Sequence, residues 1–316
     1  MRNYPQRKLR LSFLLMLTAV GCSSLFEPGA IVRSASGQQE AKVAPGSKVI
    51  VGNRFEFARV VVTGWDKDVV QAIATSGKSA ALVPVQVTKD PSDATRILVT
   101  AAPGAIRGNT DEVRLEVRVP RHVEVEAIHI SNAELEVTDI DGSVAVSSGS
   151  GGIIIKRVGS VKVRSGSGNL LVSNISGSVT VQKGSGTFTI SEVGGTLTAN
   201  FESGNARLAN VDGSIDVTTS TGKVEIRSSA RDVRVVSING RTDIRCVTGR
   251  VEVRDTSGII TLAGISGDID VTTSNGRAMF TGAVYAERRY RMKTLSGVVQ
   301  MSVSDEIAGF TATLSS

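Results

Sequence analysis

Charged side chains recur every eighteen residues in the second half of this sequence, and one set of them could perform acid and base chemistry. The set consists of Asp216, Arg234, Glu252 and Asp270. Clustered carboxylates on one face are what many carbohydrate-cleaving enzymes use as acid and base. Opposite charges alternate within the set, however, and neighbours one strand spacing apart, about 4.8 Å, would pair as an ion ladder. We therefore predict no catalytic residues and keep a polysaccharide lyase or hydrolase as the alternative.

A second charged set occupies two adjacent units and could bind anions. One unit has Lys223, Glu225 and Arg227, and the next has Arg241, Asp243 and Arg245. If the units stack in register, each charge lies beside its like and each pair repels by roughly 1 kcal/mol before salt screening. Either these side chains extend separately into water, or Lys223, Arg227, Arg241 and Arg245 form an anion-binding stripe for uronate, phosphate or carboxylate groups. We retain this stripe as the candidate binding site.

Other site chemistries find little support in the sequence. His122 and His129 are the only two histidines, and no spacing around them resembles a zinc site. The segment SSGSGG from Ser147 lacks the lysine that ends a phosphate-binding loop, so it is interpreted as a tight turn. We predict no metal and no cofactor.

An internal repeat must position the charged sets. Three of its units are SVKVRSGSGNLLVSNISG from Ser160, SVTVQKGSGTFTISEVGG from Ser178 and TLTANFESGNARLANVDG from Thr196. A glycine in the middle of each unit returns every eighteen residues, as Gly168, Gly186, Gly204, Gly222, Gly240, Gly258 and Gly276. The unit that begins at Ser143 is one residue shorter. Such a period is typical of a solenoid.

Apolar residues alternate within each unit, which predicts two short strands and an inward corner. In the unit from Ser178 they are Val179 and Val181, then Phe188 and Ile190, then Val193. One inward column is predicted to contain Val172, Ile190, Leu208, Ile226, Ile244, Leu262 and Phe280. A second contains Ile175, Val193, Val211, Val247 and Ile265, with Ser229 as the exception. Ser-Gly, Asn-Gly and Thr-Gly pairs supply the turns.

One unit cannot fold alone, and this predicts the architecture. About five apolar side chains per unit contribute roughly 1.5–3 kcal/mol each, against roughly 1–2 kcal/mol of backbone entropy for every residue. Stacking in register lets each unit share its core with two neighbours. We predict an all-β fold, a single-stranded parallel β-helix (β-solenoid) with coils of about eighteen residues over residues 126–316. Residues 46–125 are predicted to form irregular β-rich initial coils and a cap.

The N-terminus predicts export. Residues 1–21 carry four basic residues followed by an apolar run from Leu11 to Gly21, which is typical of a signal peptide and shorter than a membrane span of about 20 residues. The segment from Ala19 to Cys22 resembles a bacterial lipoprotein box, so Cys22 is the predicted lipid attachment site and the membrane anchor. A plain secretory cut that leaves a free thiol is the alternative. Residues 22–45 are predicted to be a flexible tether.

The charge balance argues against a nucleic-acid partner. The formal net charge is +6, and removing the four positive charges of the signal peptide leaves 6 − 4 = +2. A chain that is exported and nearly neutral lacks the basic character of nucleic-acid-binding domains.

Several segments resemble the bacterial "putative adhesin" family of unknown function, which is related to auto-transporter adhesin head domains. They are VVVTGWDKD ending at Asp68, VRVPRHVEVEA from Val117, the repeated Ser-Gly strands, and YRMKTLSG from Tyr290. The resemblance covers most of the mature chain and implies an exported β-solenoid with no established catalytic residues.

The sequence as a whole therefore predicts an envelope-anchored, non-catalytic solenoid used for adhesion, binding or envelope structure. Its expected partner is an acidic envelope polysaccharide or another surface protein. The expected location is the outer membrane or cell surface, as a lipoprotein, with a periplasmic or secreted protein as the alternative. A periplasmic accessory that docks another protein is a further alternative.

Overall fold

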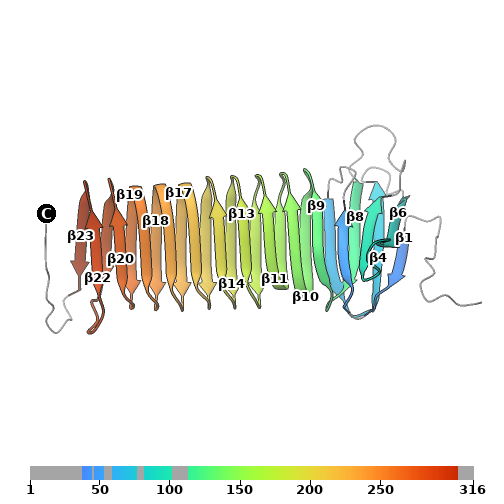
Figure 1. The fold of residues 1–316 in the computed structure, drawn as a ribbon, viewed down its shortest axis with the longest axis horizontal. Helices are drawn as coiled ribbons and strands as arrows, with labels where there is room; N and C mark the ends of the chain where they lie inside the picture. Colours follow the sequence, from blue (N-terminus) through green and yellow to red (C-terminus); the bar gives the residue numbers. More distant parts are fainter. Residues whose placement is uncertain (1–37, 45, 53–58, 77–81, 102–112, 305–316) are drawn as a thin grey trace, which may run out of the picture. The chain divides into compact units, whose positions relative to one another are not determined.

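The computed structural model describes residues 38–44, 46–52, 59–76, 82–101 and 113–304, and strands are their regular secondary structure. All 23 strands of these ranges join one network of pairings, in which the coils follow one another as the predicted solenoid (Figure 1). The predicted fold class is therefore confirmed. In these ranges no helix is long and apolar enough to span a membrane. The predicted signal peptide and Cys22 lie outside the described residues.

The repeat region is a stack of parallel strands. Its strands are β10 (Glu134–Ser148), β11 (Ile153–Ser165), β12 (Leu170–Ile175), β13 (Val179–Lys183), β14 (Thr187–Val193), β15 (Leu197–Phe201), β16 (Asn205–Val211), β17 (Ile215–Ser229), β18 (Val233–Val247), β19 (Val251–Ile265), β20 (Ile269–Thr273), β21 (Arg277–Gly282), β22 (Tyr290–Thr294) and β23 (Val298–Val303). From Val161 to Ala263, each paired residue lies beside the one eighteen positions later, as Val181 does with Ala199 and Ile190 with Leu208. Parallel pairing in register keeps the same face of successive coils turned inward.

The two predicted inward columns form the core. The column from Val172 to Phe280 is at most 1% exposed at every member, and the apolar members of the second column are at most 2% exposed. Ser229 is also only 2% exposed, and its hydroxyl donates to the carbonyl of Arg231 at 3.3 Å. That local hydrogen bond lets a polar side chain occupy a core corner without an unpaired buried group.

The mid-coil glycines are required mainly by the closeness of the coils. The five from Gly168 to Gly240, and Gly151 at the equivalent position of the short unit, have φ between 97° and 152°. Gly258 and Gly276 lie outside the left-handed region. At Gly258 and Gly276 too, an added Cβ would lie closer than 3.0 Å to the carbonyl oxygen of the preceding mid-coil glycine. The predicted need for positive φ is thus correct for only part of the column, and backbone approach explains all of it.

A second turn follows the second strand of each unit. Asn174, Glu192, Asn210, Ser228 and Cys246 adopt φ between 54° and 58° there. Changes in coil length also occur at this corner. The register changes from eighteen to seventeen residues between Ile140 and Ser143, and three extra residues precede Tyr290, which pairs with Ile269.

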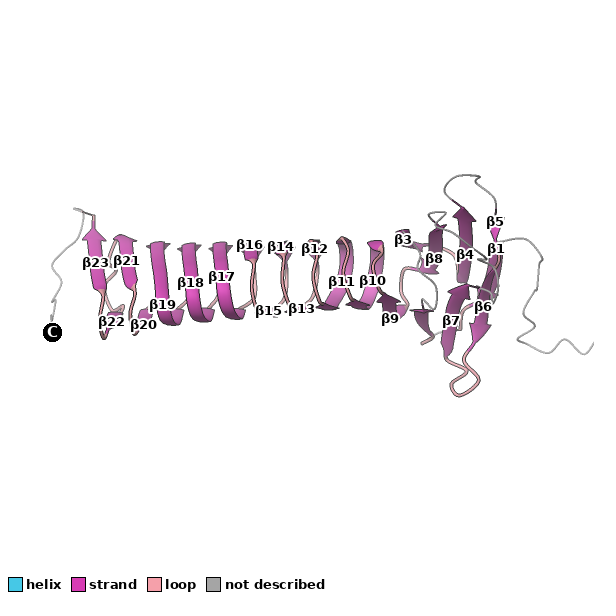
Figure 2. Ribbon diagram, turned by 90° about the horizontal axis from the view of Figure 1, so that it is seen from above, coloured by secondary structure: helices cyan, strands magenta, loops and turns pink. Residues whose placement is uncertain are grey.

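The N-terminal strands are ordered differently in space than in sequence. They are β1 (Gln38–Lys42), β2 (Lys48–Gly52), β3 (Arg59–Trp65), β4 (Val69–Ser76), β5 (Leu82–Val83), β6 (Val85–Lys89), β7 (Arg96–Ala101), β8 (Val113–Pro120) and β9 (Glu124–Ile130). β2 pairs in parallel with β7 and β9, and β3 pairs in parallel with β8 and β10. The coil made by β2 and β3 therefore lies between β7 and β8 on one side and β9 and β10 on the other (Figure 2).

Antiparallel strands continue this end of the stack. β4 pairs with β1, β5 and β8 in antiparallel fashion, and β6 does so with β7. Residues 38–42, which the sequence places in the tether, form β1.

Candidate functional site

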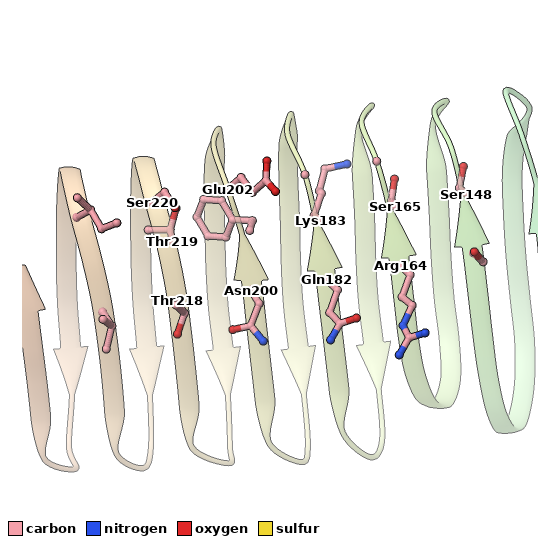
Figure 3. A pocket seen from close by; sticks show the side chains of 16 residues that line it. Ser148, Arg164, Ser165, Gln182, Lys183, Asn200, Glu202, Thr218, Thr219 and Ser220 are labelled. Atoms are coloured by element: carbon pink, nitrogen blue, oxygen red, sulfur yellow. The ribbon is translucent and has the colours of Figure 1, made fainter.

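A groove crosses six successive coils on the side of the first strand of each unit (Figure 3). Its volume is about 740 Å³. The lining residues are Ser147, Ser148, Arg164, Ser165, Gly166, Gln182, Lys183, Gly184, Asn200, Phe201, Glu202, Thr218, Thr219, Ser220, Val236 and Ile238. They belong to three adjacent positions of the repeat, which we call the wall, the floor and the turn.

The wall consists of outward side chains at the end of the first strand. Arg164, Gln182, Asn200 and Thr218 form a row across successive coils and are all exposed (Figure 3). Register pairing places each of them beside the next, at about one strand spacing of 4.8 Å. Within the described part of the chain their side chains take part in no hydrogen bond or ion pair. The row therefore presents free donors and acceptors at a regular interval.

The floor is the next, inward-facing position. Three of its members donate a hydrogen bond from the side-chain hydroxyl to the backbone carbonyl two residues later. Ser148 donates to Ser150 at 3.0 Å, Ser165 to Ser167 at 3.0 Å, and Thr219 to Thr221 at 3.1 Å. Phe201 fills the position in its coil and packs edge-on against Phe188, with ring centroids 5.0 Å apart.

Lys183 is the charged member of this stretch of the floor. It is only 5% exposed. Its ammonium nitrogen has no hydrogen-bond partner among the residues that the structure describes. Burial lowers the pKa of Lys183 below its ordinary value.

The predicted anion-binding stripe lies on the second strand of two coils, away from this groove, and has the predicted register. Lys223 pairs with Arg241, Glu225 with Asp243, and Arg227 with Arg245. Because the outward positions alternate, every cation of the stripe shares its face with a carboxylate two residues away. The like charges do stack, as the sequence indicates.

The carboxylates of the same strands neutralise half of the stripe. Lys223 forms an ion pair with Glu225, which lowers the pKa of Glu225. Arg241 donates to Asp243 at 2.9 Å, which raises the pKa of Arg241. In the described ranges, Arg227 and Arg245 have no carboxylate partner. The stripe as an anion site stays a prediction, and its unpaired part is these two arginines.

The first charged set forms an ion ladder together with Arg250, which is not a member of the set, because Glu252 and Asp270 are neighbours of like charge. Arg234 lies 3.5 Å from Asp216 and 4.0 Å from Glu252. Arg250 bridges the two neighbouring acids, at 3.8 Å from Glu252 and 3.6 Å from Asp270. Each carboxylate of the set therefore has a cation partner.

The described residues contain no group of three or more His, Cys, Asp or Glu side chains placed to hold a metal ion. The groove itself was missed by the sequence reasoning. One feature of the sequence could have indicated it: a lysine stands at position 183, where the equivalent positions 148 and 165 have serine.

Solved structures similar to this chain carry adhesin names. A "putative cell adhesion protein" from Clostridium sporogenes is 12% identical, with 60% of this chain and 98% of that chain covered and a TM-score of 0.32. "Putative adhesins" from Bacteroides fragilis and Parabacteroides distasonis are 14% and 10% identical, cover 84% and 83% of this chain and 95% of each of those chains, and have TM-scores of 0.33 and 0.34. No family model and no curated protein matches.

Proposed function

We propose that this chain is an exported, envelope-anchored, non-catalytic solenoid that binds an extended polysaccharide in the groove. The wall is the observation that carries the proposal. Arg164, Gln182, Asn200 and Thr218 present unpaired guanidinium, amide and hydroxyl groups at a constant interval across successive coils. A ligand that matches them must itself be extended and carry hydrogen-bonding groups along its length.

The chemistry of the lining favours a polysaccharide. Amide and hydroxyl side chains both donate and accept, as sugar hydroxyls do. Gly166 and Gly184 at the turn leave the backbone open beside the wall. The ion ladder supports a non-catalytic role, because Asp216 and Asp270 each lie within 4.0 Å of an arginine.

Replacing Gln182 and Asn200 together with alanine is expected to weaken polysaccharide binding by about tenfold, since each hydrogen bond contributes roughly 0.5–1.5 kcal/mol. The probes are polygalacturonate and its neutral methyl ester, and the measurement is isothermal titration calorimetry on the full chain. Both substituted side chains are exposed, so the melting temperature should not change.

The matched control is the double variant Arg227→Gln, Arg245→Gln on the second-strand face. It should bind both polymers as wild type does. If it loses binding while the groove variant keeps it, the stripe is the site and the groove is not.

Cys22→Ser is expected to move the protein from the detergent phase to the aqueous phase. A diacylglyceryl cysteine with a further acyl chain holds a protein on a membrane far more firmly than one chain does. Phase partitioning of the wild type and the variant, both expressed with the signal peptide, measures this. A wild type that already partitions into water contradicts the lipid anchor.

A further inference from the structure

We infer that Lys183 is an anion subsite in the floor of the groove, so that the polysaccharide bound there carries acidic groups such as carboxylate or sulfate. This inference rests on the proposed function, because it names the class of polymer that the same groove accepts. Two observations support it: the ammonium group of Lys183 is buried, and the equivalent residues of neighbouring coils satisfy their polar groups within the protein.

The ammonium of Lys183 is buried without compensation from the protein. The residue ends β13, with the inward orientation of Val179 and Val181, and is 5% exposed. Lysine is seldom buried to this extent unless it is paired. Its nitrogen finds no partner among the described residues, and burying an unpaired charge is unfavourable.

Packing alone does not explain a lysine at this position. The equivalent residues Ser148, Ser165 and Thr219 satisfy themselves by hydrogen bonding to their own turns. A lysine kept only for its aliphatic stem normally extends its charged end to water. Here the charged end is held beneath the surface.

The groove lies beside this charge, while the ammonium nitrogen itself is buried. Lys183 lines the groove, next to Gly184 and Gly166, which place no side chain over the floor. The ammonium extends toward the coil of Ser165, whose neighbour in the wall is Arg164 (Figure 3). A carboxylate or sulfate that entered between these coils would find one cation in the wall and another in the floor.

Among the described residues, no carboxylate occupies that role. Glu202, in the turn of the following coil, also lines the groove but forms no ion pair with Lys183 within the 4.0 Å that defines one. The charge at the floor thus has no counterion among the described residues. The ligand therefore has to be anionic at the point that faces this coil.

Two substitutions test the subsite. Lys183→Ser installs the residue that Ser148 and Ser165 provide in their coils, and Lys183→Met keeps the chain length without the charge. Both should fold, and both should melt at or above the temperature of the wild type. Binding of polygalacturonate should fall at least tenfold in both, whereas binding of its methyl ester should not change. Dextran sulfate and dextran form a second matched pair that separates sulfate from carboxylate as the preferred group.

Inorganic sulfate gives an outcome that does not depend on a polymer. At constant ionic strength, sodium sulfate should raise the melting temperature of the wild type, and of the Arg227→Gln, Arg245→Gln control, more than that of either Lys183 variant.

Equal binding of the acidic polymer and its ester by wild type, or full binding of the acidic polymer by Lys183→Met, overturns the subsite while the groove stands. Protection by sulfate without binding of any polymer keeps the subsite and overturns the proposed function. Equal sulfate protection of all variants overturns the subsite.

Discussion

Ile226→Asp is expected to lower the free energy of unfolding by about 3–5 kcal/mol, because it leaves an unpaired charge in the core. Ile226 is fully buried and stacks between Leu208 and Ile244 of the neighbouring coils. The aspartate would lose the apolar burial of isoleucine and gain no hydrogen-bond partner there. Urea denaturation followed by circular dichroism measures the change.

Thr218→Asp is the control for this substitution, since Thr218 lies on the same strand, β17, but faces outward and is exposed. Its effect should stay within about 0.5 kcal/mol, as is usual for surface positions. If the two variants unfold at the same urea concentration, the inward and outward assignment of β17 is wrong.

Gly222→Ala is expected to cost about 2–4 kcal/mol, from both conformational strain and a steric clash. Gly222 has φ of 129°, a conformation that residues with a Cβ rarely adopt. The added Cβ would also meet the carbonyl oxygen of Gly204, which belongs to the coil below and is itself held by the stack. Thermal unfolding should show a lower melting temperature.

Gly152→Ala is the matched control, because no atom lies within 4 Å of a Cβ built at that glycine and its φ is not in the left-handed region. Loss of chain entropy in the unfolded state should leave this variant as stable as wild type, or about 0.4–1 kcal/mol more stable. Equal destabilisation of both variants would show that coil spacing does not determine the glycine column.

The repeat region could be predicted from the sequence because each coil can be compared with its neighbours. A residue such as Ile226 has an equivalent in the neighbouring coils, and stacking in register fixes its direction once one member is assigned inward. The N-terminal coils offer no such comparison. β2 pairs with both β7 and β9, far apart in sequence, and alternation alone does not indicate which strands become partners.

The sequence predicts which charged residues stack on one another in neighbouring coils, but it does not predict which of them form ion pairs. In-register stacking of Arg227 on Arg245 follows from the period. The sequence does not determine that Glu225 and Asp243 each bind a cation on their own strand, because that depends on side-chain rotamers. Position 183 shows the same limit. The lysine is visible in the sequence, but whether its ammonium reaches water is a property of the packed coil.

The corner after the second strand has a consequence for how the chain can change length. One unit is short between Ile140 and Ser143, and another has three extra residues before Tyr290, yet Val144 and Tyr290 both resume their columns. Within this chain, the differences in coil length are absorbed at this corner. A loop, an affinity tag or a fluorophore placed after Gly282 should project from the stack without turning any core residue outward. A whole duplicated coil would lengthen the groove by one strand spacing, so under the proposed function the copy number of the repeat sets the length of polymer that the groove accommodates.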